Sequence, residues 1–81
     1  MWYVVSSSDI IAEEPTYRQA RQACLASCLD GRKYPDIRRI KAGLYAYEQS
    51  SRALTSHRKS YLIGTQQALT AHGIQLEDLG R

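Results

Sequence analysis

The residues with the most evident binding chemistry are cations and tyrosines in the middle third of the chain. Residues 32–59 carry eight lysines and arginines against two acidic residues, a net charge of +6, whereas the whole chain carries +3. Guanidinium and ammonium groups attract phosphates, and tyrosine rings offer surfaces on which unpaired bases stack. We therefore predict a partner-binding set that comprises Arg32, Lys33, Arg38, Arg39, Lys41, Tyr45, Tyr47, Arg52, Arg58 and Lys59.

Two other interpretations of these residues stay open. A run of charges is commonly a solvated face, and tyrosines in a sheet are commonly packing groups. Arginine and tyrosine are also enriched at protein interfaces, so an acidic protein surface is as good a partner as nucleic acid.

The sequence offers few residues at a spacing suited to metal binding or nucleophilic catalysis. Cys24 and Cys28 have three residues between them, whereas the usual structural zinc pattern has two, and His57 and His72 lie fifteen residues apart. The two cysteines share one face of a predicted helix, which favours buried thiols in a reducing compartment over a disulfide. We expect no metal and no cofactor.

Acid–base catalysis is no better supported. The adjacent carboxylates, Glu13–Glu14 and Glu77–Asp78, are more simply solvating groups. The five glycines are dispersed, so the chain has no glycine-rich phosphate loop. The sequence therefore predicts that the protein is not an enzyme.

The first half of the chain predicts a hairpin followed by a helix. Residues 2–6 are rich in aromatic and β-branched side chains, residues 6–9 favour a turn, and residues 10–12 suit a returning strand. We expect Trp2 in the core; the alternative is an exposed anchor for a partner. Thr16 and Gln19 fit a capping box at the start of a helix over residues 16–30. That helix presents one apolar stripe of Tyr17, Ala20, Cys24, Leu25, Cys28 and Leu29.

Residues 36–48 fit either a strand or a helix. As one strand, Ile40 to Ala46 place alternate apolar residues on a core face and turn Arg39, Lys41, Tyr45 and Tyr47 outward together. As a helix, Ile37, Ile40, Leu44 and Tyr47 align, but Gly43 would cost about 1 kcal/mol relative to alanine. We favour the strand, on which the proposed outward face depends.

The last third predicts a helix over residues 50–72, capped by Ser50 or Ser51 and ended by Gly73, with Gly64 marking a bend or close packing. Ile74, Leu76 and Leu79 would fold the tail back onto the core. The expected fold is α+β, a small single domain spanning residues 1–81. Its antiparallel sheet would carry two helices on one face, in the order β-β-α-β-α.

Hydropathy and the first residues of the chain bear on where in the cell the protein is expected. No stretch reaches the roughly 18–20 apolar residues of a membrane span, and the first residues lack the basic region of a signal peptide. We expect a cytoplasmic protein without membrane contact. A homodimer is possible through self-pairing of an edge strand at residues 2–6.

Two functions follow as hypotheses. The first is a non-catalytic binding protein that docks through its basic, aromatic face on nucleic acid or on a complex that handles nucleic acid. The alternative is a stoichiometric protein inhibitor or adaptor, in general character like the short proteins with which phages and mobile elements block host complexes.

Overall fold

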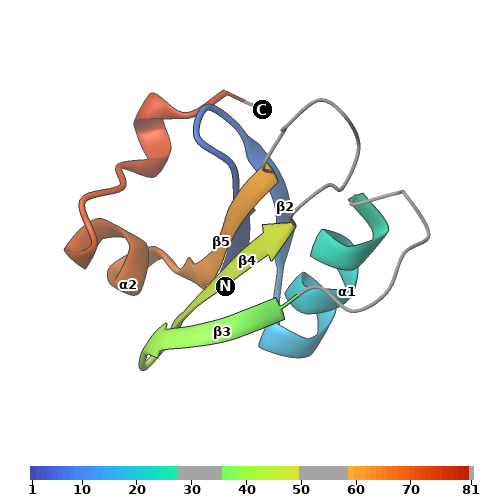
Figure 1. The fold of residues 1–81 in the computed structure, drawn as a ribbon. Helices are drawn as coiled ribbons and strands as arrows, with labels where there is room; N and C mark the ends of the chain where they lie inside the picture. Colours follow the sequence, from blue (N-terminus) through green and yellow to red (C-terminus); the bar gives the residue numbers. More distant parts are fainter. Residues whose placement is uncertain (28–35, 50–58, 81) are drawn as a thin grey trace.

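A computed structural model describes residues 1–27, 36–49 and 59–80. In chain order the elements are β1 (Trp2–Val5), β2 (Ile10–Glu14), α1 (Tyr17–Ser27), β3 (Asp36–Lys41), β4 (Leu44–Gln49), β5 (Lys59–Thr65), α2 (Gln66–Ala71) and the short 3-10 helix η1 (Leu76–Asp78). The five strands form one antiparallel sheet in the order β2-β1-β5-β4-β3 (Figure 1). The predicted α+β class is confirmed, with two strands more than expected. No helix in the described ranges has the length and apolarity needed to cross a membrane.

The first hairpin forms where the sequence predicts it. Ser6 closes the turn, because its backbone N–H donates to the Asp9 carbonyl at 2.8 Å and its hydroxyl accepts from the Asp9 N–H at 3.0 Å. The returning strand β2 runs two residues further than expected, to Glu14, and pairs with β1 except at Ile11, where the register shifts.

Helix α1 begins at the predicted cap. The Gln19 N–H donates to the Thr16 hydroxyl at 3.2 Å, which satisfies one of the orphan donors of the first turn. Ala20 and Cys24 are fully buried on the predicted stripe, and Tyr17 and Leu25 pack at its margin. The predicted end of the helix at residue 30, with Cys28 and Leu29, lies outside the described residues.

The expectation of one strand over residues 36–48 is wrong. The segment is a hairpin in which β3 and β4 join through a two-residue turn at Ala42 and Gly43. Gly43 has φ +78°, a left-handed conformation that other residues adopt reluctantly. Alternation of apolar residues continues in phase across this turn, which is why the pattern also fits one longer strand.

The expected helix over residues 50–72 is also wrong in its described part. Lys59–Thr65 form β5, and only Gln66–Ala71 are helical. Thr65 is the cap, since its hydroxyl accepts from the Ala68 N–H at 3.2 Å, and the predicted caps Ser50 and Ser51 lie outside the described residues. Gly73 follows the helix with φ +94°, which confirms the predicted stop.

The sheet buries both of its faces, and the two helices cover opposite faces. On the α1 side, Val4 and Ile63 pack with Ala20, Cys24 and Tyr47. On the α2 side, the neighbouring strand residues Val5 and Leu44 pack with Ala68, Leu69 and Leu76. The prediction of two helices on one face is therefore wrong, because a sheet with alternating apolar residues on both sides needs a cover on each. Figure 1 shows α1 and α2 on either side of β4 and β5.

The chain ends are built into the sheet. Strand β1 lies between β2 and β5, so the proposed self-pairing of residues 2–6 is wrong, because both of its edges are occupied. The tail residues Ile74, Leu76 and Leu79 pack on the α2-side core as predicted. Gly80 then pairs with Asp9 in a parallel bridge.

Candidate binding surface

The structure describes some of the predicted binding residues and not others. Arg38, Arg39 and Lys41 are exposed on β3, and Tyr45 and Tyr47 lie on β4. Lys59 begins β5, and only its backbone is described. The remaining four, Arg32, Lys33, Arg52 and Arg58, lie outside the described residues.

Strand register divides the predicted set between the two faces of the sheet. Arg39 pairs with Tyr45, whose ring lies on the α1 side. Arg38 pairs with Ala46 and Lys41 with Leu44, which places both cations on the α2 side. The expectation that Arg39, Lys41, Tyr45 and Tyr47 point outward together is therefore wrong. The turn at Ala42 and Gly43, together with a bulge at Ile40, changes which residues share a face.

Tyr47 is a core residue. Only 2% of its surface is exposed, and it packs with Val4 and Ile63 beneath α1. Its ring centroid lies 5.7 Å from that of Tyr61, an ordinary distance for packed aromatic pairs. Tyr47 therefore contributes to packing and presents no ring to a partner.

Three half-buried rings form an aromatic cluster at the margin of the α1-side core. They come from three separate elements: Trp2 from β1, Tyr17 from α1 and Tyr45 from β4. Tyr17 and Tyr45 stack with centroids 4.2 Å apart and an interplanar angle of 28°. Trp2 lies edge-on to Tyr17 at 5.3 Å and tilted to Tyr45 at 6.2 Å. Each of the three residues is partly exposed to solvent.

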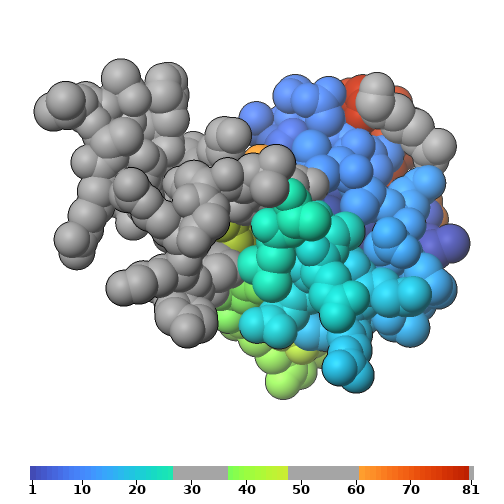
Figure 2. Space-filling view, turned by 90° about the vertical axis from the view of Figure 1, so that its right-hand side faces the viewer, coloured from blue at the N-terminus to red at the C-terminus, as the bar shows by residue number. Residues whose placement is uncertain are grey.

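Two exposed arginines flank the aromatic cluster. Arg39 lies across the strand pair from Tyr45, a position from which side chains meet. Arg21 lies one helical turn beyond Tyr17 on the same face of α1. Burial raises the pKa of Tyr17 above its ordinary value, the positive charge of Arg21 opposes this shift, and Tyr45 and Cys24 add to it. Figure 2 looks onto this side, with α1 in cyan toward the viewer, the N-terminal residues in blue beside it and β3 in green at the lower edge.

The surface so formed is aromatic at its centre and cationic on two sides. Glu14, half-buried opposite Trp2 on the neighbouring strand, adds one negative charge at the far margin. The sequence pattern placed Arg39 and Tyr45 on one face of a single strand, and the structure instead pairs them across β3 and β4. The pattern did not predict Tyr17 and Arg21, because the helical stripe was assigned wholly to the core and the exposed face of α1 wholly to solvent. Trp2, which was expected in the core, is half-buried and packs against the α1-side core from its margin.

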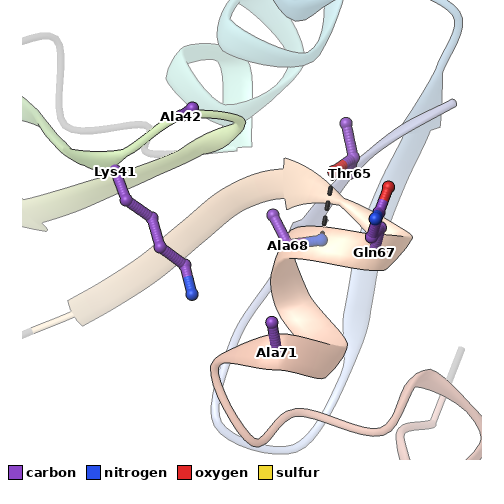
Figure 3. A pocket seen from close by; sticks show the side chains of 6 residues that line it. All are labelled: Lys41, Ala42, Thr65, Gln67, Ala68 and Ala71. Atoms are coloured by element: carbon purple, nitrogen blue, oxygen red, sulfur yellow. Dashed lines mark hydrogen bonds between the residues drawn. The ribbon is translucent and has the colours of Figure 1, made fainter.

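The α2 side carries a shallow hollow of a different kind. A cavity of about 360 Å³ is lined by Lys41, Ala42, Thr65, Gln67, Ala68 and Ala71. Figure 3 shows Lys41 reaching from the end of β3 across the space beside α2. One cation and small side chains give this cavity little with which to select a ligand.

Metal-binding groups do not gather within the described ranges. No three residues among the histidines, cysteines and carboxylates of those ranges lie close enough to hold a metal ion. Cys24 is fully buried in the α1-side core, as predicted, and His72 is exposed at the end of α2. Cys28 and His57 lie outside the described residues.

Comparison with known proteins gives no relative: no family model, no curated protein and no solved structure matches this chain.

Proposed function

We propose that this chain is a non-catalytic binding protein that holds single-stranded nucleic acid on the α1 side of its sheet. The observation that carries the proposal is the junction of the aromatic cluster, Trp2, Tyr17 and Tyr45, with the exposed guanidinium groups of Arg39 and Arg21. Open ring surface is a stacking platform for unpaired bases, and arginine beside it neutralises the phosphates.

The charge distribution supports the same partner. Residues 32–59 carry +6 in total, and β3 contributes three exposed cations, Arg38, Arg39 and Lys41, within four residues. A nucleic-acid backbone that runs along the edge strand β3 would contact Arg39 on the α1 side of the sheet and Arg38 and Lys41 on the α2 side. Phosphate contacts of this kind weaken as salt rises, with a slope that reflects the number of phosphates neutralised.

The test uses the only tryptophan of the chain as its reporter. Trp2 lies in the aromatic cluster, so stacking of a base changes its fluorescence directly. The intact protein is titrated with a mixed-sequence single-stranded oligonucleotide over a range of salt concentrations. We expect binding at low salt, a change in Trp2 emission, and an affinity that falls linearly on a log–log salt plot.

Two neighbouring arginines give a matched pair of variants. Arg39→Ala removes the cation beside the aromatic cluster, and Arg38→Ala removes an equal charge from the other face. We expect Arg39→Ala to weaken binding more and to lower the salt slope by about 1. Equal losses for the two variants, or no binding at low salt, would overturn the proposal.

The second candidate, a protein inhibitor or adaptor, draws on the same side chains. Tryptophan, tyrosine and arginine dominate the energetic centres of protein interfaces, and all three meet in this surface. It is favoured if immobilised protein recovers one acidic protein in stoichiometric amount while the oligonucleotide fails to bind. Loss of that recovery in Arg39→Ala, and not in Arg38→Ala, assigns the docking to the same face.

A further inference from the structure

The two edges of the described sheet share an unusual feature. In the described part of the chain three large hydrophobic side chains are exposed, and two of them, Ile11 at 37% and Ile40 at 44%, lie on the edge strands β2 and β3. Each is the extra residue of a β-bulge. Val4 and Val5 pair with Ala12 and Ile10, which leaves out Ile11, and the step from Arg39 to Lys41 in the other pair leaves out Ile40. Both edges therefore present an isoleucine that no sheet partner covers.

The charges beside these isoleucines are opposite. Strand β2 carries Glu13 and Glu14, whereas β3 carries the three cations Arg38, Arg39 and Lys41 against Asp36 at its start, so its net charge is +2. The charges also match face by face. Glu13 lies on the α2 side, because it pairs with Tyr3, and Arg38 and Lys41 lie on the same side, because they pair with Ala46 and Leu44. Glu14 and Arg39 both lie on the α1 side.

We propose that the β3 edge of one molecule docks on the β2 edge of a second copy of this chain, head to tail. Strands β2 and β3 run in the same direction, because four antiparallel pairings separate them. Joining the two edges with like faces side by side therefore makes a parallel pair of strands. On the α2 side this arrangement brings Glu13 toward Arg38 and Lys41, and on the α1 side it brings Glu14 toward Arg39.

The same charges select against the simpler alternative. A two-fold dimer would place β2 against β2 or β3 against β3, and like charges directly opposed across strands are destabilising. Bulges and charges commonly protect edge strands from indiscriminate pairing. Here they oppose like-with-like contacts and permit only the unlike contact. A head-to-tail contact does not close at two copies, so it produces rings or filaments.

Among the described residues, the C-terminal tail pairs with the acidic edge only at its beginning. Gly80 covers only the beginning of β2, where its carbonyl accepts from the Ile10 N–H at 2.6 Å. This contact with Asp9 is itself a parallel bridge. The outer edge of β2 thus already accepts a strand running in the direction that the proposed contact requires, and Ile11 to Glu14 continue beyond it.

The test is the mass of the intact protein as a function of concentration and salt, measured by analytical ultracentrifugation. We expect the weight-average mass to rise with concentration past that of a dimer at low salt. It should return toward the monomer at about 1 M salt, where the screening length is about 3 Å. A wild-type protein that stays monomeric at low salt, or an assembly that stops at a dimer, would overturn the proposal.

Charge-reversed variants identify the edges. Glu13→Lys with Glu14→Lys makes both edges basic, and Arg38→Glu with Arg39→Glu and Lys41→Glu makes both edges acidic. Each variant alone should be monomeric, and an equimolar mixture should assemble again, because every contact between the two different variants joins a basic edge to an acidic one. Restored assembly in the mixture also shows that both variants fold.

A matched control separates edge charge from net charge. Asp78→Lys on η1 and Glu13→Gln with Glu14→Gln on β2 each raise the net charge by 2. At the same low salt concentration the Asp78→Lys protein should assemble further than the β2 variant, because it keeps both acidic groups of the β2 edge. Assembly lost equally in this control, or unchanged in the edge variants, would contradict the proposed contact. The two proposals share Arg39, so oligonucleotide binding is also measured on the Glu13→Lys with Glu14→Lys variant, which is expected to be monomeric and keeps β3 and the aromatic cluster. Binding without assembly, or assembly without binding, then separates the two proposals.

Discussion

The two faces of the sheet differ in the side chains that close them. On the α2 side, Val5, Leu44 and Leu69 are aliphatic and fully or almost fully buried, and Tyr3 is the one aromatic residue among the partly buried side chains described around them. On the α1 side, a buried centre gives way to a margin of half-exposed rings from Trp2, Tyr17 and Tyr45. The comparison indicates that one face is devoted to stability, while the other combines packing with an accessible surface.

The largest effect is expected at Leu69. Leu69→Ala should lower the free energy of unfolding by about 2–5 kcal/mol, because it leaves a cavity in the closed aliphatic cluster. Urea denaturation followed by circular dichroism measures the loss. Trp2→Leu, on the open margin of the other face, should cost clearly less. Equal losses would mean that the two faces do not differ in the way their exposure suggests.

A smaller effect is expected at Gly64, where α2 packs closely on β5. A Cβ there would lie 2.9 Å from Leu44 Cδ1, 3.0 Å from the Gly43 carbonyl oxygen and 3.2 Å from Leu69 Cγ. Gly64→Ala should therefore destabilise by about 1–3 kcal/mol through overpacking, as measured in the same denaturation experiment.

Gly73 provides the control for Gly64. Gly73 has φ +94° and nothing within 4 Å of an added Cβ, so the loss of stability on substitution there arises from backbone conformation alone. Asparagine tolerates that conformation better than alanine does, so Gly73→Asn should be milder than Gly73→Ala. At Gly64 the order should reverse, because asparagine is larger. The same order at both positions would show that space does not limit Gly64.

The smallest effect concerns pH and Tyr17. Since burial raises the pKa of Tyr17 in the folded state, its contribution to stability is fully present below the unfolded pKa and is lost as pH rises through the folded value. Wild type should thus lose stability above about pH 10, and Tyr17→Phe should lose less. Thermal melts at neutral and alkaline pH measure this difference. An identical alkaline loss in both proteins would assign it to other groups.

Local signals predicted the first half of the fold well. The hairpin of β1 and β2 and the start of α1 depend on neighbouring residues: the serine-rich turn, the Thr16 cap and the period of the helical stripe. Such features need no knowledge of distant partners. The α+β class followed from them and from the apolar content of the remaining chain.

The second half was harder because β5 is buried on both faces. Tyr61, Leu62 and Ile63 form a continuous apolar run whose periodicity does not distinguish a central strand from a helix. Gly43 was a turn signal that the alternation around it concealed. The aromatic cluster depends on β1, α1 and β4 meeting in space, so no spacing within one segment could reveal that Trp2, Tyr17 and Tyr45 are neighbours.

The central place of β1 has a consequence for synthesis of the chain. Val4 pairs on one side with Ala12, which follows almost at once, but on the other side with Ile63. At about 5–20 residues per second, roughly 3–12 seconds separate the translation of Val4 from that of Ile63. Throughout that interval one hydrogen-bonding edge of the nascent β1 is unsatisfied, so the native sheet cannot be completed until β5 has been translated.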